Sequence, residues 1–426
     1  MKMKQLWRKA ACWTAALLCS GPMSSGAPSF PSSCVSTASS LRPACDACLA
    51  DTTIYRQSRR TQRLWGGYAY PGNLSTAYEY PDSIALTVPE VHTRSARRLA
   101  EYLSTRLETE EDLVRGIYIW IARNIEYSVY ADFQSRNVIY NEKEDVQQTL
   151  DERNGVCRQY ALLFRDLCSR VGIACQTIQG YNRNGEMLLP TPHEWCMAMV
   201  DGQWYLFDPT WGAGTMEDYT FTPLLNDRYF MLSSAELLAT HMPFDPMWQM
   251  CEPPLTYEQF DAGASYAGHR FLSTAEWEKK LAAYLAQDSL ARLEGVVERM
   301  KHNPGMNKLV ENEYLLLYSQ ISTLKRKQVV DRFNEAQDLW EEAVDLVNSF
   351  IRYRKNGFKP VRSRAETLAI LSSAATRNNR AAALVDAIQD APDDCIEKIG
   401  RLKQRIDELA VRIEEEKKTL KTEEGS

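Results

Sequence analysis

The feature that most constrains the fold is the dipeptide Asp201-Gly202, near the middle of the chain. Asp-Gly between two apolar segments is typical of a two-residue β-turn, because both central positions of that turn have a positive φ angle. Residues 194–200 precede the dipeptide and residues 203–207 follow it. We therefore expect two antiparallel strands, in which alternate side chains share a face.

This hairpin brings two polar residues to one face. Counting back from the turn, Trp195 lies opposite Asp208, and His193 lies opposite Thr210. His193 and Asp208 are then diagonal neighbours, roughly 7–8 Å apart at the backbone, so their side chains can meet. A slip of one residue would send them to opposite faces. A carboxylate bonded to one imidazole nitrogen fixes the tautomer of the ring and stabilises its charged form.

A nucleophile candidate lies upstream, at the start of an apolar helix. Cys157 follows the turn signal Asn154-Gly155 and precedes apolar residues at helical spacing. A helix N-terminus carries partial positive charge and free N–H groups, which stabilise a thiolate. A Cys157 thiolate beside a His193 imidazolium would be an activated nucleophile for acyl transfer, and the Cys157 N–H could stabilise an oxyanion.

Each residue alone has an ordinary explanation, because a lone cysteine on an apolar helix face usually belongs to the core. The joint placement of three groups favours catalysis. Three further cysteines show no such partners and are expected to be structural, namely Cys168, Cys175 and Cys196. A zinc site of Cys157, His193 and Cys196 lacks the spacing for a fourth ligand. The other histidines have no motif nearby, namely His92, His241, His269 and His302.

Helical periodicity surrounds this α+β core. Three helices are expected ahead of Cys157, over residues 94–107, 110–124 and 140–153. Thr109 is placed to cap the second of them. The cysteine helix should end near Gly172, and a strand should follow over residues 173–181.

Beyond about residue 270 the pattern is almost wholly helical. Helices are expected over residues 277–300, 308–324, 328–353, 365–377 and 380–389. The last helix carries a heptad stripe of Ile and Leu that Glu416 interrupts. Packing within its own helical region is favoured over dimerisation.

The N-terminus has the pattern of an export signal: basic residues up to Lys9, an apolar run to Cys19 and small residues to Ala27. We expect residues 1–27 to be a signal peptide and the chain to be periplasmic, cell-surface or secreted; lipid attachment at Cys19 is the less favoured alternative. Residues 28–85 are expected to form a linker or poorly ordered lead-in.

Composition adds two exclusions. The net charge is −6 and the pI about 5.6, which argues against a nucleic-acid-binding surface. Beyond the signal, no stretch is long and apolar enough for an integral membrane span.

Together these motifs resemble the transglutaminase-like superfamily, in its secreted bacterial and kyphoscoliosis-peptidase-like branch. The resemblance rests on residues 117–127, 155–161, 172–173, 193–195 and 208–211, and it covers roughly residues 110–212. It implies an α+β papain-like transglutaminase core, here assigned to residues 86–262. An all-α C-terminal region over residues 270–426 lies outside the resemblance.

The resemblance also implies a mechanism. Cys157 would be the nucleophile, His193 the base and Asp208 the residue that orients it. The implied function is that of an exported acyl-transfer enzyme, which acts on protein or peptide amides through a thioester. A cysteine peptidase or amidase of the same fold is the first alternative, and an inactive binding or scaffold module of the cell envelope is the second. No metal or organic cofactor is implied, and calcium stays open.

Overall fold

The computed structural model describes residues 72–73, 75–128, 142–217, 220–264, 266, 268–389 and 391–422, all within one compact unit, Tyr55–Ser426. The expected signal peptide, Cys19 and most of the expected lead-in lie outside the described residues. Among the helices that the structure describes, none has the length and apolar character needed to span a bilayer.

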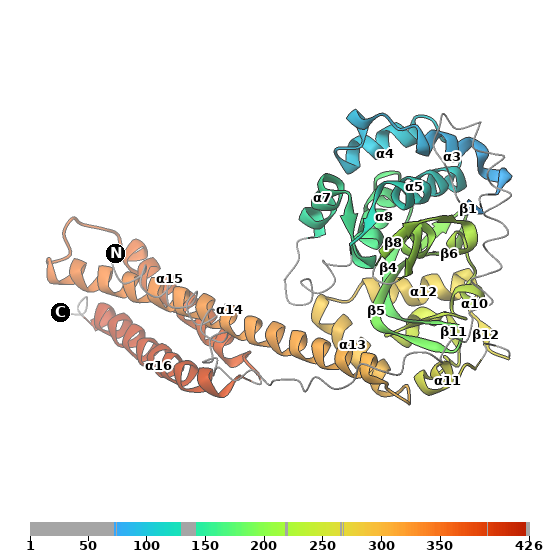
Figure 1. Ribbon diagram of the computed structural model, residues 1–426. Coiled ribbons are helices and arrows are strands. Elements are labelled where there is room, and N and C mark those ends of the chain that lie inside the picture. Colours follow the sequence, from blue (N-terminus) through green and yellow to red (C-terminus); the bar gives the residue numbers. More distant parts are fainter. Residues whose placement is uncertain are drawn as a thin grey trace, which may run out of the picture. The chain divides into compact units, whose positions relative to one another are not determined.

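The globular part is built around a four-stranded antiparallel sheet with the strand order β10-β4-β5-β6, of which β4, β5 and β6 are labelled in Figure 1. Its strands are β4 Cys175–Asn184, β5 Met187–Val200, β6 Gln203–Phe207 and β10 His241–Pro243. β5 is longer than the sequence predicts, because residues 187–192 also pair with the far end of β4. β10 comes from a later part of the chain and covers the outer edge of β4.

The predicted hairpin between β5 and β6 is confirmed. Val200 pairs with Gln203, and the ladder continues to Cys196 opposite Phe207. Asp201 and Gly202 have φ angles of 49° and 74°, as this turn requires.

Five helices pack on one another and cover one face of the sheet through α8 (Figure 1). They are α3 Glu79–Leu86, α4 Ala96–Ser104, α5 Glu110–Asn124, α7 Glu142–Glu152 and α8 Cys157–Arg170. The predicted bounds of α5 are confirmed, and the Thr109 side chain accepts the Asp112 N–H at 3.0 Å as its N-cap. Gly172 has a φ angle of 86° just after α8, where a left-handed residue was expected.

Helix α3 corrects the expected lead-in at its C-terminal end. Within α3, the Asp82 carboxylate accepts two hydrogen bonds from the Arg115 guanidinium, at 2.6 and 2.8 Å. Arg115 also lies 2.7 Å from Asp227. The Arg115 and Asp82 side chains are 0% and 3% exposed, so water does not hydrate either charge, and each depends on its partner. This long-range pairing orders α3, and the local sequence pattern contains no sign of it.

The opposite face of the sheet packs on elements from later in the chain. These are α10 Ser234–Leu237, η6 Pro246–Gln249, α11 Tyr257–Asp261, α12 Thr274–Leu285 and α13 Ser289–Lys301. Trp195 and Met197 of β5 enter this core together with Trp248 and Trp277. Since Trp195 and His193 share a face of β5, the His193 ring belongs to this side of the sheet.

Short elements complete the globular part. The helical turns are η2 Thr76–Tyr78, η3 Glu90–His92, α9 Pro209–Ala213 and η5 Asp227–Tyr229. The strand pairs are β1 Gly72–Asn73 with β9 Leu225–Asn226, β2 Glu126–Tyr127 with β3 Asn154–Gly155, β7 Gly214–Glu217 with β8 Thr220–Pro223, and β11 Cys251–Glu252 with β12 Arg270–Phe271.

From α12 onwards the described C-terminal region is all-α, as predicted, but it begins after strand β12 and its helix boundaries differ. The single helix expected over residues 277–300 is divided into α12 and α13, because Asp288 caps a new helix by accepting the Ala291 N–H at 2.8 Å. Conversely, two pairs of expected helices are continuous as α14 Lys308–Lys355 and α15 Arg364–Asp386. The joining residues are Lys325-Arg326-Lys327 in α14, which favour helix, and Asn378-Asn379 in α15, and neither segment includes Gly or Pro.

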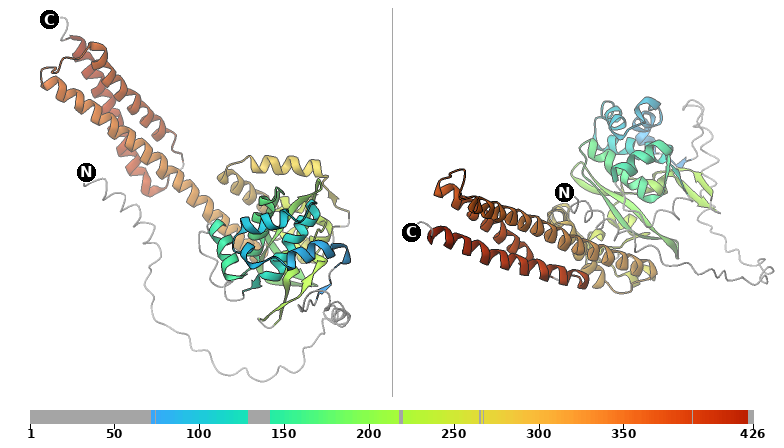
Figure 2. Two further views of the ribbon diagram at one scale, coloured as in Figure 1. Left: turned by 90° about the horizontal axis from the view of Figure 1, so that it is seen from above. Right: turned by 90° about the vertical axis from the view of Figure 1, so that its left-hand side faces the viewer.

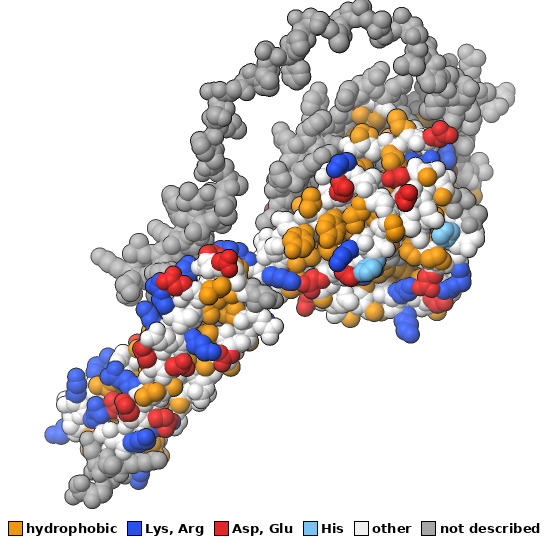
Figure 3. Space-filling model, turned by 90° about the horizontal axis from the view of Figure 1, so that it is seen from below, with side chains coloured by type: hydrophobic (Ala, Val, Ile, Leu, Met, Phe, Trp, Pro, Cys, Tyr) orange, Lys and Arg blue, Asp and Glu red, His pale blue; other side chains and the backbone are white. Residues whose placement is uncertain are grey.

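Helices α14, α15 and α16 Asp393–Thr422 lie side by side (Figure 2). The apolar stripe of α16 is buried against the other two, with Ile406 beside Ala336 and Ala381. Glu416, which interrupts the stripe, is bonded to Arg354 of α14. Charges of both signs are interspersed over these helices, and no single-sign patch stands out on the face that Figure 3 presents.

Replacing Arg115 with Leu should destabilise the globular part strongly. The change leaves the Asp82 and Asp227 carboxylates without their partner, at a cost of about 3–5 kcal/mol in the free energy of unfolding. Arg94→Ala is the matched control, because Arg94 pairs with Glu90 at side-chain exposures of 73% and 80% and should change stability by less than about 1 kcal/mol. Urea unfolding measures both, and equal losses would contradict the prediction.

Candidate active site

Cys157 is half-buried at the first position of α8. The preceding strand β3 is held beside β2, and the Gln159 side chain accepts the Val156 N–H at 3.2 Å. Gly155 permits this tight entry, because a Cβ atom there would lie 2.6 Å from the Gln159 Cβ. The chain thus presents the Cys157 thiol at a helix N-terminus, where N–H groups and partial positive charge favour an anion.

His193 lies on β5 with 8% of its surface exposed. Its Nε2 atom is 2.7 Å from Asp208 Oδ2, and the Cys157 side chain lies close enough to help raise the pKa of the ring. With Nε2 engaged by the carboxylate, Nδ1 is the nitrogen left for the sulfur. The structure therefore brings together all three residues that the sequence singled out.

Asp208 is fully buried and caps the short helix α9. Its Oδ1 accepts the N–H groups of Thr210 at 2.9 Å and Trp211 at 3.0 Å. These two backbone donors fix the plane of the carboxylate, so that Oδ2 faces the imidazole of His193.

The two partners shift each other's titration. Burial lowers the pKa of His193, but the Asp208 charge, its hydrogen bond and that of Cys157 outweigh burial and raise this pKa to about 10. Burial raises the pKa of Asp208, but the His193 charge and the hydrogen bonds from His193 and His241 hold it well below its usual value. The carboxylate is thus ionised, and the His193 ring is held charged across the neutral range.

His241 is a member of the site that the sequence reasoning missed. Its Nε2 atom lies 3.1 Å from Asp208 Oδ2, and its Nδ1 atom lies 2.8 Å from Thr240 Oγ1. Burial lowers the pKa of His241 and outweighs the opposing effect of Asp208. The side chain reaches the site because β10 pairs with β4, placing His241 opposite Asn182. No local motif signals that pairing.

Tryptophans flank the histidines. Trp195 is fully buried, whereas Trp211 is half-buried, with its ring 5.7 Å from that of His193 and 4.7 Å from that of His241. Of these two rings, Trp211 is the one that can meet a ligand next to His193. Trp204 is also half-buried and packs at the edge of the core behind the sheet.

The atoms of this site that could bind a metal ion are hydrogen-bonded to one another. His193, Asp208 and His241 offer ligand atoms within 4.8 Å of one another, the spacing of a metal site. However, both Nε2 atoms are bonded to the carboxylate, and its other oxygen is bonded to two amides. The zinc alternative with Cys196 does not form, because Cys196 is buried on the opposite face of β5, where its thiol contacts the Ala161 carbonyl at 3.4 Å.

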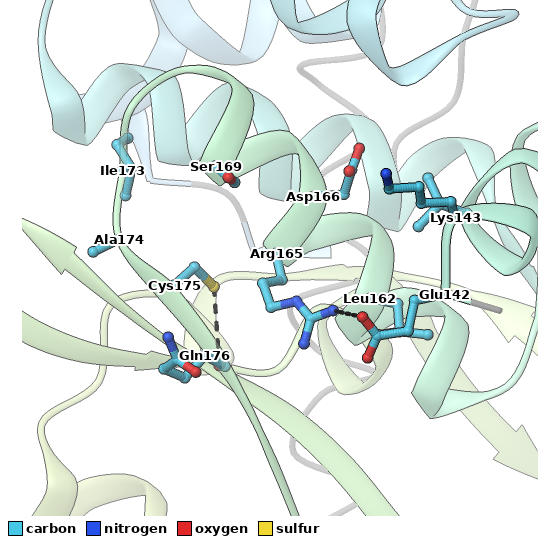
Figure 4. A pocket seen from close by; sticks show the side chains of 11 residues that line it. Glu142, Lys143, Leu162, Arg165, Asp166, Ser169, Ile173, Ala174, Cys175 and Gln176 are labelled. Atoms are coloured by element: carbon cyan, nitrogen blue, oxygen red, sulfur yellow. Dashed lines mark hydrogen bonds and ion pairs between the residues drawn. The ribbon is translucent and has the colours of Figure 1, made fainter. Parts of the chain in front are cut away.

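A cavity of about 390 Å³ lies elsewhere, between α7, the C-terminal half of α8 and the start of β4 (Figure 4). Arg165 and Glu142 form an ion pair of 2.7 Å at its wall, and Cys175 lines it. Arg165 lies eight positions after Cys157 along α8, a rise of about 12 Å. This cavity is therefore separate from the Cys157 site.

Residues 97–209 match the sequence model of the transglutaminase-like superfamily. This segment contains Cys157 at the start of α8, His193 on β5 and Asp208 just after β6. The chain thus carries a transglutaminase-like domain with a papain-like α+β fold, as expected.

The chain is also similar to curated proteins. The kyphoscoliosis peptidases of Mus musculus and Homo sapiens are 31% identical to this chain over 215 and 175 residues, which are 46% and 38% of the chain. The chain spans only 31% and 25% of their lengths. A solved structure described as a TGase is 16% identical, with a TM-score of 0.24, and the match covers 43% of this chain and 42% of that one.

The His193–Asp208 pair predicts a pH-dependent stability. The raised pKa of His193 stabilises the fold fully below its unfolded value of about 6.5, and this contribution is lost as the pH rises to about 10. The depressed pKa of Asp208 stabilises the fold above about pH 4, and this contribution is lost in acid.

Urea unfolding at several pH values should therefore show the largest deficit of His193→Gln against the wild type between about pH 4 and 6.5, with the deficit shrinking towards pH 10. His302→Gln, at an exposed position on the surface, is the control and should show no such trend. A deficit of constant size across this range would contradict the pairing.

Proposed function

We propose that this chain is a cysteine-dependent acyl-transfer enzyme that acts on protein or peptide amides through a thioester. One observation carries the proposal: a half-buried cysteine at a helix N-terminus lies beside an imidazole whose Nε2 is 2.7 Å from a buried carboxylate. A nucleophile, a base and an orienting acid in this order are the minimum set for such chemistry.

In the proposed reaction, the Cys157 thiolate attacks the amide carbonyl carbon, and the C=O electron pair moves to oxygen. The Cys157 N–H at the start of α8 is placed to donate to that oxyanion. As the C–N bond breaks, the His193 imidazolium gives its proton to the departing amine. The enzyme is left as a thioester with a neutral imidazole, and Asp208 remains ionised throughout.

The second half of the reaction decides the class of enzyme. The neutral His193 ring takes a proton from the incoming nucleophile, which attacks the thioester and releases the thiolate. A primary amine gives transamidation, and water gives hydrolysis. The similarity to kyphoscoliosis peptidases supports hydrolysis as the second candidate within the same chemistry.

Export is part of the proposal, based on the pattern of residues 1–27. Periplasmic, cell-surface and secreted locations share this requirement. A non-catalytic scaffold is the rival from another class, with the α14–α16 helices as the binding part. The half-buried Cys157 and the neighbouring His193–Asp208 pair support the enzyme, because a scaffold needs neither.

Thiol labelling separates the enzyme from the scaffold. With iodoacetamide at pH 6, Cys157 should be alkylated at least about tenfold faster than Cys395, a half-buried free cysteine on α16. His193→Gln should remove this difference, because the imidazolium that stabilises the thiolate is lost. Mass spectrometry of the two cysteine peptides follows both rates. Equal labelling in the wild type would support the scaffold.

Product analysis then identifies the reaction. Glutamine-containing peptides incubated with the full chain, with and without an added alkylamine, should give an acylated amine or a hydrolysed amide. Cys157→Ala should lower either product by about a thousandfold or more. Cys395→Ala is the control and should keep full activity. Products that persist in Cys157→Ala would overturn the proposed nucleophile.

A further inference from the structure

The proposed catalytic carboxylate has a second imidazole on it. Asp208 accepts four hydrogen bonds: two backbone N–H groups bind Oδ1, while His193 at 2.7 Å and His241 at 3.1 Å share Oδ2. His241 is 0% exposed and takes no part in the reaction as proposed. A buried, hydrogen-bonded titratable group beside a reactive centre calls for a role of its own.

We infer that His241 is a positioning residue, which acts as a neutral donor on Oδ2 and keeps the Asp208 carboxylate ionised and directed at His193. The inference rests on the proposed function and extends it from three residues to four. His241 does not touch the reacting atoms, and it acts through Asp208 alone.

The neutral state of His241 follows from its surroundings. The ring is fully buried, and the charged His193 ring is 5.4 Å away, so a second positive charge there is disfavoured. A neutral imidazole has one N–H group, and the Nε2 contact with a carboxylate requires it there. Nδ1 is then an acceptor, and the Thr240 hydroxyl, 2.8 Å away, can donate to it in place of the Leu237 carbonyl oxygen at 3.2 Å. Thr240 thereby sets the tautomer that Asp208 needs.

Other titratable groups around this network come from several elements. They are His193 of β5, Cys157 and Tyr160 of α8, Tyr118 of α5 and Tyr229 of η5. Burial raises the pKa of Tyr118 and of Tyr160, so both phenols stay neutral in the range considered. The charged partner of Asp208 is thus His193, which lies between it and the Cys157 sulfur.

Loss of the His241 donor should raise the pH below which the Cys157 thiol loses its reactivity. A charge-assisted hydrogen bond removed from a buried carboxylate raises its proton affinity by roughly one to two pH units. Protonated Asp208 can no longer stabilise the His193 imidazolium, so the reactive thiolate–imidazolium pair disappears at a higher pH. The alkaline limit, where His193 itself loses its proton, should move less.

The experiment measures the rate at which iodoacetamide alkylates Cys157 in the full chain from about pH 2 to pH 9, a range that reaches below the usual pKa of an aspartate. His241→Leu removes the donor, and the acid limb of its pH–rate profile should lie roughly one to two pH units above that of the wild type. At a pH on that limb, its alkylation rate should be about tenfold lower than that of the wild type. His241→Gln can place an amide N–H near the Nε2 position and should restore the wild-type limb. His302→Leu, at an exposed histidine on the surface, is the control and should leave the profile unchanged.

The outcomes are distinguishable. If the wild-type profile does not depend on His193, the proposed function fails. If the wild-type profile depends on His193 but the profile of His241→Leu overlays it, the inference about His241 fails while the proposed function stands. A purely structural role would lower the melting temperature of His241→Leu and Gln alike without moving the limb. Should His241→Leu not fold, Thr240→Val takes its place: a smaller shift in the same direction supports the inference, and no shift overturns it.

Discussion

The Asp208 carboxylate is the group on which the rest of the site depends. It is buried without access to water, and a buried charge persists only when hydrogen bonds and an opposite charge replace its hydration. The chain supplies these from three directions: the first turn of α9, the β5 strand with His193, and the β10 strand with His241. The two strands and α9 are therefore held to one geometry by a single side chain, and the thiol is held through His193.

The sheet gives this network its precision. Gly180 on β4 lies opposite His193 on β5 and opposite Pro243 on β10, so it stands between the two strands that carry the histidines. A Cβ atom at Gly180 would lie 2.1 Å from the Met242 carbonyl oxygen and 2.5 Å from the Trp195 ring. The absence of a side chain there lets β10 approach close enough for His241 to reach Asp208. The close packing of β10 on β4 is thus also a requirement for the hydrogen bond between His241 and Asp208.

Much of the fold could be predicted because its signals are local. The Asp201-Gly202 turn fixed the β5–β6 register, and Thr109 and Gly172 marked the ends of helices through backbone chemistry that acts within one turn. The boundaries that were missed depended on distant contacts. Helix α3 is held against α5 by the contact of Asp82 with Arg115, and α14 is continuous across a polar stretch that resembles a break only in hydrophobic pattern.

The sequence by itself determined that a cysteine would begin a helix and that His193 and Asp208 would share one face of a hairpin, because turn chemistry and the period of a strand act over a few residues. Only the tertiary structure decided that the hairpin would be laid against the start of α8, and that β10 would bring His241 to the same carboxylate. Those placements come from strand pairing and core packing between residues far apart in the chain, where the partner of a residue is selected by the whole fold and leaves no mark in the neighbouring sequence.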